Sequence, residues 1–282
     1  MSIHLSIPLS AKEPLNKTEN TITWHTFEAP PLMILKGQQK NTGIVDGLRS
    51  LLQHSLNDFE HEEINLPYKR YLRDAKEKRN ICTAYLFKTP MREEFLYFSK
   101  PAIIFPGFEI ILHKDTYAKL DYPAEISLHD LFEKFNFRLA TNQIRSYGPK
   151  IDPIIKAYEA KRKVSRHTGS TTLVFRLIAS KRADFMIDFP NRVLYWAQEL
   201  NLDPYDFLSI PIKEDYKNAI SYVACPKTEW GKNVIDKVNT VLSEHIATPA
   251  YLDILKRWSP EYHKQEIDEL HKILIKKNKE AL

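Results

Sequence analysis

The stretch TPMREEFLYFSKPAIIFPGFEIILHK, residues 89–114, sets one cation, Arg92, beside two carboxylates and then runs into two apolar segments. Their β-branched and aromatic content is typical of buried strands, so they form a strand pair or one long strand broken at Pro106-Gly107. The guanidinium of Arg92 either lies in solvent, paired with Glu93 or Glu94, or faces an anion. The stretch therefore predicts a bend in the chain and a candidate anion-binding arginine.

Length and composition predict a globular chain. The 282 residues are 43% hydrophobic and 27% charged, which suits one large or two ordinary domains. No apolar run approaches the roughly 20 residues that span a bilayer. The net charge of +5 is mild and the basic residues are interleaved with acidic ones, so we do not expect nucleic-acid binding.

Strands and helices alternate on both sides of the bend. Periodicity and capping signals predict helices at 44–59, 68–79, 127–135, 170–181, 190–200, 231–246, 249–258 and 261–277, and a loop leading into a helix over 145–163. Strands are predicted at 21–24, 80–87, 137–142, 183–188, 207–212 and 219–225. This alternation favours two α/β lobes with mostly parallel pairing.

Several motifs follow one another in a familiar order. TITW, APPLMI and GIVD come first, followed by a T-x-x-R stretch with F-S-x-P beginning six residues after the arginine, which here is Thr89, Arg92, Phe98, Ser99 and Pro101. IDFPNRVLYW fits the pattern x-D-x-P-x-x-x-x-Y, and YVACPKTEW, VNTVL and YLDILKRW form the tail. Over about 20–260 the chain resembles the bacterial extracellular solute-binding proteins of polar amino acid uptake, the type II periplasmic binding proteins.

The resemblance implies an α/β fold of two lobes, each a mixed sheet flanked by helices, with two hinge crossings near Gly107–Ile110 and Tyr222–Ala224. Lobe 1 would comprise 21–106 and 222–262, lobe 2 would comprise 107–221, and 263–282 would add a C-terminal helix. Residues 1–20 are either the remnant of a signal peptide, since LSIPLSA precedes a charged pair, or an ordinary disordered leader. We expect a monomer in the periplasm or another extracytoplasmic compartment, its signal peptide truncated or removed.

The resemblance also implies a ligand cleft between the lobes. Arg92 would hold a ligand carboxylate through its planar fork. Asp188 would hold the ligand ammonium, with a role as helix N-cap as the alternative. The loop at Gly148 would offer backbone N–H groups at a helix start. We also expect ligand contacts from Thr89 and Glu28.

The chain departs from the family at positions where small residues are common. Tyr85 and Phe87 precede the T-x-x-R stretch, and Tyr147 stands in the second-lobe loop. These rings either line the cleft, which would favour a modified or aromatic ligand, or point into the lobe cores.

The expected function is capture of a small carboxylate-bearing ligand by hinge closure, with an ABC permease or a membrane sensor as partner. One alternative is a ligand-sensing or partner-regulating module of the same fold. Another is an enzyme like cyclohexadienyl dehydratase, in which Glu28 or Asp188 could act as acid or base.

No cofactor or metal motif stands out in the sequence. His61 lies among glutamates without the spacing of a metal site and is interpreted as part of a solvated face. Cys82 and Cys225 also lack metal-ligand spacing, and the sequence leaves open whether they are free or bridged.

Overall fold

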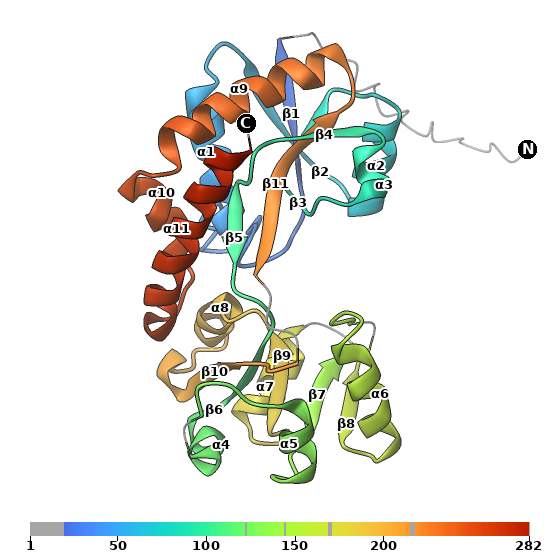
Figure 1. Cartoon of the computed structure of the whole chain (residues 1–282), viewed down its shortest axis with the longest axis vertical. Coiled ribbons are helices and arrows are strands. Elements are labelled where there is room, and N and C mark those ends of the chain that lie inside the picture. Colours follow the sequence, from blue (N-terminus) through green and yellow to red (C-terminus); the bar gives the residue numbers. More distant parts are fainter. Residues whose placement is uncertain (1–19, 122, 144, 169–170, 215–217, 282) are drawn as a thin grey trace, which may run out of the picture.

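The structure is a computed structural model that describes residues 20–121, 123–143, 145–168, 171–214 and 218–281. Most of the predicted leader, residues 1–20, lies outside these ranges. Figure 1 shows two lobes joined by a narrow connection, the upper built around one sheet and the lower around another. Within the described residues, no helix is both long enough and apolar enough to cross a membrane.

Lobe 1 is built on a six-stranded sheet in the order β2-β1-β3-β11-β4, with β5 also pairing with β11. Its strands are β1 (Thr21–Thr26), β2 (Glu60–Asn65), β3 (Ile81–Leu86), β4 (Leu96–Phe98), β5 (Ile103–Phe105) and β11 (Ala219–Pro226). Its helices are α1 (Ile44–Ser55), α2 (Tyr68–Lys76), α3 (Pro90–Glu93), α9 (Glu229–His245), α10 (Pro249–Lys256) and α11 (Lys264–Glu280), the last preceded by the 3₁₀ turn η3 (Glu261–His263).

Lobe 2 is built on a five-stranded sheet in the order β10-β6-β9-β7-β8. Its strands are β6 (Glu109–His113), β7 (Leu139–Asn142), β8 (Val164–His167), β9 (Phe185–Asp188) and β10 (Phe207–Pro211). Its helices are α4 (Lys114–Tyr117), α5 (Leu128–Glu133), α6 (Ile151–Ala160), α7 (Thr171–Ala179) and α8 (Asn191–Glu199), with 3₁₀ turns η1 (Ala118–Leu120) and η2 (Pro204–Asp206).

Strand pairing is mixed in both lobes. In lobe 1, β1 pairs in parallel with β2 and β3, whereas β11 is antiparallel to β3, β4 and β5. In lobe 2, β7 is parallel to β8 and β9, and β6 is antiparallel to β9 and β10. The prediction of mostly parallel pairing was therefore wrong, because the strands adjoining the crossings run back against their neighbours.

Local sequence signals explain where two helices begin. Asp46, in the first turn of α1, accepts hydrogen bonds from the backbone N–H groups of Gly43 (3.0 Å) and Ile34 (2.9 Å). Ser127 caps α5 by accepting from the N–H of His129 at 3.1 Å. Both residues satisfy donors that a helix start leaves unpaired.

A disulfide joins β3 to β11 across lobe 1. Cys82 and Cys225 are bonded over a sequence separation of 143, and both are fully buried within the lobe 1 core. The same core includes apolar residues of α1, α9, α10 and α11, so segments from both ends of the chain complete it. The sequence left open whether these cysteines are free or bridged, and the structure shows them bridged.

The chain crosses between the sheets twice. The first crossing spans residues 106–108, since β5 ends at Phe105 and β6 begins at Glu109. The second lies between Pro211 and Ala219, the ends of β10 and β11. Residues 219–221 pair with β5, and 222–224 lie inside β11, so the second crossing precedes the position predicted near 222–224.

The C-terminal segment contacts both lobes. Ile267, Leu270 and Leu274 of α11 belong to the lobe 1 core, and Figure 1 shows the helix beside β5. Just before α11, His263 forms an ion pair with Glu109 of lobe 2, and its Nε2 also lies 2.7 Å from the Ser209 hydroxyl. The segment is thus a third connection between the lobes, one that runs through side chains.

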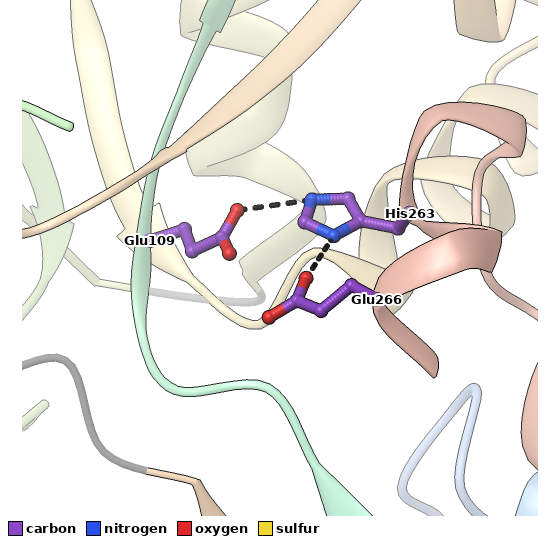
Figure 2. A group of neighbouring side chains, drawn as sticks. All are labelled: Glu109, His263 and Glu266. Carbon is purple, nitrogen blue, oxygen red and sulfur yellow. Dashed lines mark hydrogen bonds and ion pairs between the residues drawn. The ribbon is translucent and has the colours of Figure 1, made fainter. Parts of the chain in front are cut away.

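His263 bridges two carboxylates (Figure 2). Its Nε2 lies 3.0 Å from Glu109 Oε2 and its Nδ1 lies 2.5 Å from Glu266 Oε2. Burial alone would lower the pKa of His263, but the two carboxylates outweigh that effect and raise the pKa to about 9. The ring is therefore an imidazolium at neutral pH, and each N–H faces one carboxylate.

We predict that removing the disulfide destabilises the fold strongly. Replacing both Cys82 and Cys225 with Ala opens a long loop in the unfolded chain and should lower the free energy of unfolding by about 2–5 kcal/mol. Thermal and urea unfolding of the two proteins measure the difference. Ready alkylation of both cysteines in denatured, unreduced wild-type protein would show that the bridge is absent.

We predict that the bridge made by His263 weakens at alkaline pH. Because its folded pKa lies above the ordinary 6.5, its contribution is complete below about pH 6.5 and is lost as pH rises through about 9. The contribution is roughly 3 kcal/mol, from a pKa difference of about 2.5 units. Urea unfolding from pH 6 to 9 should show this decline in the wild type and in His54→Gln, an exposed control on α1. Equal slopes in His263→Gln and the wild type would contradict the assignment.

Candidate functional site

A hollow of about 350 Å³ lies where the chain passes between the lobes. Its lining comes from lobe 1, from both crossings and from lobe 2, and consists of Phe87, Gly107, Phe108, Tyr147, Phe189, Asn218 and Ala219. Four of these seven residues are aromatic, and the hollow has the size of a small-molecule site. Because residues of both lobes form its walls, its shape depends on the angle between them.

Aromatic side chains of lobe 2 form one wall of the hollow. Phe108 stacks on Phe189 with ring centroids 4.5 Å apart and meets Tyr147 edge-on at 5.3 Å. The Arg145 guanidinium lies over the rings of Phe108 (5.3 Å) and Tyr147 (5.7 Å). This wall gathers three aromatic rings beside a cation.

Asp188 lies beside this wall, at the end of β9, and is 1% exposed. Its Oδ1 accepts from Arg145 Nη2 at 3.0 Å and from the Phe189 N–H at 2.8 Å, and it forms an ion pair with Arg192, whose Nε lies 3.3 Å away. The N-cap position of α8 is Pro190, so Asp188 caps the turn before the helix rather than the helix itself. Its predicted contact with a ligand ammonium stays a prediction.

Arg92 lies in α3 of lobe 1 and is partly buried. Its Nη1 donates to the carbonyl oxygen of Phe87, and its guanidinium carbon lies 5.5 Å from the Tyr68 ring centroid. Among the described residues, its buried Nε has no hydrogen-bond partner. Glu93, proposed as a surface partner for Arg92, pairs with Lys88 at 2.9 Å instead. Arg92 is therefore held against the segment that carries Phe87 and keeps an unused donor.

The other predicted lobe 1 residues surround this segment. Thr89 caps α3 by accepting from the Arg92 N–H, so its hydroxyl has a local role. Phe87 is 36% exposed and lines the hollow, and Tyr85 meets Phe87 edge-on at 5.4 Å. Glu28 is exposed, and its Oε2 accepts from the N–H of Leu35 at 3.2 Å. Of these side chains, Phe87 is the one in the wall of the hollow.

The second-lobe loop is held together by its own hydrogen bonds. Tyr147 N–H donates to Asp152 Oδ1 at 2.7 Å, and Gly148 N–H lies 3.4 Å from the Ser146 hydroxyl. The φ of Gly148 is +99°, a backbone conformation that favours glycine. The backbone donors expected for a ligand are thus engaged within the loop. The predicted role of Gly148 stays a prediction.

For Tyr147 the sequence left two positions open, one lining the cleft and one in the core of a lobe. The structure shows Tyr147 in both. Its ring lines the hollow and also belongs to a lobe 2 core, and its hydroxyl lies 2.6 Å from Thr141 Oγ1. Burial raises the pKa of Tyr147 to about 12. The ring is therefore held in place by the lobe 2 core while it borders the hollow.

The sequence did not indicate the aromatic and cationic side chains Phe108, Arg145, Phe189 and Arg192, nor the lining residues Gly107, Asn218 and Ala219. Two of them had a usable signal, because Phe108 follows the Pro-Gly bend and Phe189 follows Asp188 directly. Arg145 had none, since its partner Asp188 is 43 residues away in the chain.

Glu109, His263 and Glu266 form a group whose ligand atoms lie within 4.8 Å of one another. Each carboxylate faces a different nitrogen of the same ring (Figure 2). A metal ion would need one ring nitrogen and the carboxylates to converge on a single point. The arrangement is that of an imidazolium between two carboxylates, and the expectation of no metal stays a prediction.

No protein-family model and no curated protein matches this chain. Solved structures do match it over most of its length. The ancestral cationic amino acid solute-binding protein AncCDT-1 aligns with a TM-score of 0.66 and 18% identity, covering 86% of this chain and 96% of that one. This chain has the two-lobed type II periplasmic-binding-protein fold. The fold expected from the sequence resemblance is thereby confirmed.

Two further structures with this fold show its range. The probable amino-acid ABC transporter extracellular-binding protein YtmK from Bacillus subtilis aligns with a TM-score of 0.63 and 17% identity, covering 84% of this chain and 97% of that one. The periplasmic VFT2 domain of BvgS from Bordetella pertussis aligns at 0.55 and 15%, covering 85% and 94%. In this chain, the hollow lies between the two lobes, next to the two crossings.

We predict that the charge of Asp188 matters more than its capping. Asp188→Asn keeps an acceptor for the Phe189 N–H but leaves Arg145 and Arg192 without their carboxylate. The free energy of unfolding should fall by about 3 kcal/mol, since removing one member of a buried ion pair leaves the other charge buried and uncompensated. Urea unfolding measures the change. A loss below about 0.5 kcal/mol would favour the capping role, because asparagine caps as well as aspartate.

Proposed function

We propose that this chain captures a small carboxylate-bearing ligand between its lobes and closes around it. The observation that carries the proposal is the aromatic hollow at the crossings, whose walls come from both lobes and are flanked by guanidinium groups. Phe87 and Phe108 offer faces to a flat apolar body, and Arg92 has a buried, unused N–H. A planar fork of this kind suits a carboxylate.

The similar structures support a binding role in transport or sensing. They include proteins named as amino-acid-binding components of ABC transporters, a histidine kinase sensor domain and a BvgS domain. We propose membership of the polar amino acid solute-binding family, with an ABC permease or a membrane sensor as partner. The two roles differ in the partner that would contact the closed form, which is a permease in transport and a membrane sensor in signalling.

An extracytoplasmic location is part of the proposal. The disulfide between Cys82 and Cys225 supports it, since such bonds persist in oxidising compartments. The similar proteins are described as extracellular or periplasmic, which agrees.

The dehydratase alternative has less support from the site. One similar structure is described as a precursor of cyclohexadienyl dehydratase. Of the two groups suggested as acid or base, Asp188 is engaged by two guanidinium groups and Glu28 is an exposed residue of the loop after β1. Neither lines the hollow, so we propose binding without catalysis.

Calorimetry with Arg92→Ala tests the proposal. A thermal-shift screen of amino acids, dipeptides and aromatic acids first identifies a ligand, and small-angle scattering should show a more compact bound form. Arg92→Ala should then weaken binding about 30-fold or more, corresponding to about 2–5 kcal/mol. Arg73→Ala, an exposed arginine on α2 of the same lobe, should bind as the wild type does.

Two results would contradict the proposal. Unchanged affinity in Arg92→Ala would remove Arg92 from the site. Absence of any ligand in the screen would remove the binding function itself.

A further inference from the structure

The charges beside the hollow are unbalanced. On lobe 2, two guanidinium groups, Arg145 and Arg192, share the single carboxylate of Asp188. Their side chains are 25% and 17% exposed, so water screens their charge only in part. One positive charge on this wall remains without a partner among these groups, and a partly buried cation without a counter-ion is costly.

Lobe 1 adds a further cation beside the hollow, because Arg92 Nη1 donates to the carbonyl oxygen of Phe87, and Phe87 lines the hollow. Arg92 lies over Tyr68, and its positive charge opposes the rise that burial causes in the pKa of Tyr68. Burial raises the pKa of Tyr85 to about 12, and the charges of Arg192 and Arg145 oppose that rise. Guanidinium groups of both lobes thus lie beside residues that line the hollow, Arg92 beside Phe87 and Arg145 beside Phe108 and Tyr147.

Asp188 offers little to a ligand cation. Its Oδ1 already accepts from Arg145 and the Phe189 N–H and pairs with the charge of Arg192, and the residue is 1% exposed. An ammonium group placed there would meet two guanidinium groups at close range, and like charges at such distances repel. The wall therefore suits an anion better than a cation.

We propose that the ligand carries two anionic groups and no ammonium group. One anionic group would bind Arg92 and the other would bind the Arg145–Arg192 pair, while a flat apolar body rests on Phe87 and Phe108. The chemical class is an aromatic or similarly flat dicarboxylate. This inference rests on the proposed function, which it narrows from any carboxylate-bearing ligand to a dianion.

Three ligands with the same ring test the inference in the full-length chain. L-phenylalanine is a zwitterion, 3-phenylpropanoate a monoanion and phenylsuccinate a dianion at pH 7.5. Calorimetry should give phenylsuccinate at least tenfold higher affinity than 3-phenylpropanoate, and L-phenylalanine the lowest of the three. Raising the salt concentration should weaken phenylsuccinate most, because charge pairing contributes most to its binding.

Variants locate the second anion site. Arg145→Gln should reduce the preference for phenylsuccinate over 3-phenylpropanoate to less than threefold. Arg138→Gln is the matched control, an exposed lobe 2 arginine beside Asp184, and should keep the tenfold preference. If melting shows that Arg145→Gln does not fold, Arg192→Gln is measured in the same way and has the same expected result.

The outcomes separate this inference from the proposed function. If L-phenylalanine or another zwitterion from the wider screen binds more tightly than the dianion, the inference is wrong and ligand capture stands. An unchanged preference in folded Arg145→Gln or Arg192→Gln also overturns it. If neither these three ligands nor the wider screen gives any binding, both the inference and the proposed function are wrong.

Discussion

The pairing of β11 with strands from earlier in the chain holds this structure together. After lobe 2 is complete, the chain returns and inserts β11 between β3 and β4, and the disulfide from Cys82 to Cys225 fastens this strand covalently. The helices that follow β11 then bury apolar residues in the lobe 1 core. Without the returning strand, lobe 1 would lack both the centre of its sheet and part of its core. The two crossings, and hence the cleft, exist because the chain leaves and re-enters one sheet.

Much of the fold could be predicted from the sequence because its elements carry strong local signals. The apolar spacing in α1, the cap at Ser127 and the Pro-Gly bend before Phe108 all reflect local chemistry. The strand β2 escaped prediction because its letters, EHEEIN, are mostly charged and it pairs at the sheet edge with β1 alone. His61 on this strand accepts a hydrogen bond from Trp24 Nε1 at 3.1 Å, a contact that no local pattern indicates.

The candidate site was less predictable because its geometry depends on residues far apart in the chain. The T-x-x-R stretch pointed to Arg92, and the bulky residues Phe87 and Tyr147 do line the hollow. The ion pair of Asp188 with Arg145 could not be foreseen, since Arg145 comes from the loop after β7, 43 residues away, whereas Arg192 lies only four residues after Asp188. A sequence shows that an arginine is present, but the partner of its charge is decided by tertiary packing.

The contact between His263 and Glu109 has a mechanical consequence for motion between the lobes. Glu109 is the first residue of β6, directly after the first crossing, so this attachment lies close to the line about which the lobes would swing. A link near a rotation axis is scarcely stretched by rotation about that axis, whereas twisting or sliding of one lobe against the other would pull it apart. If the lobes swing as proposed, the imidazolium and its two carboxylates would oppose twisting and sliding more than the swing itself. For the proposed closure, the segment before α11 would then help to set the path between the open and the closed arrangement of the lobes.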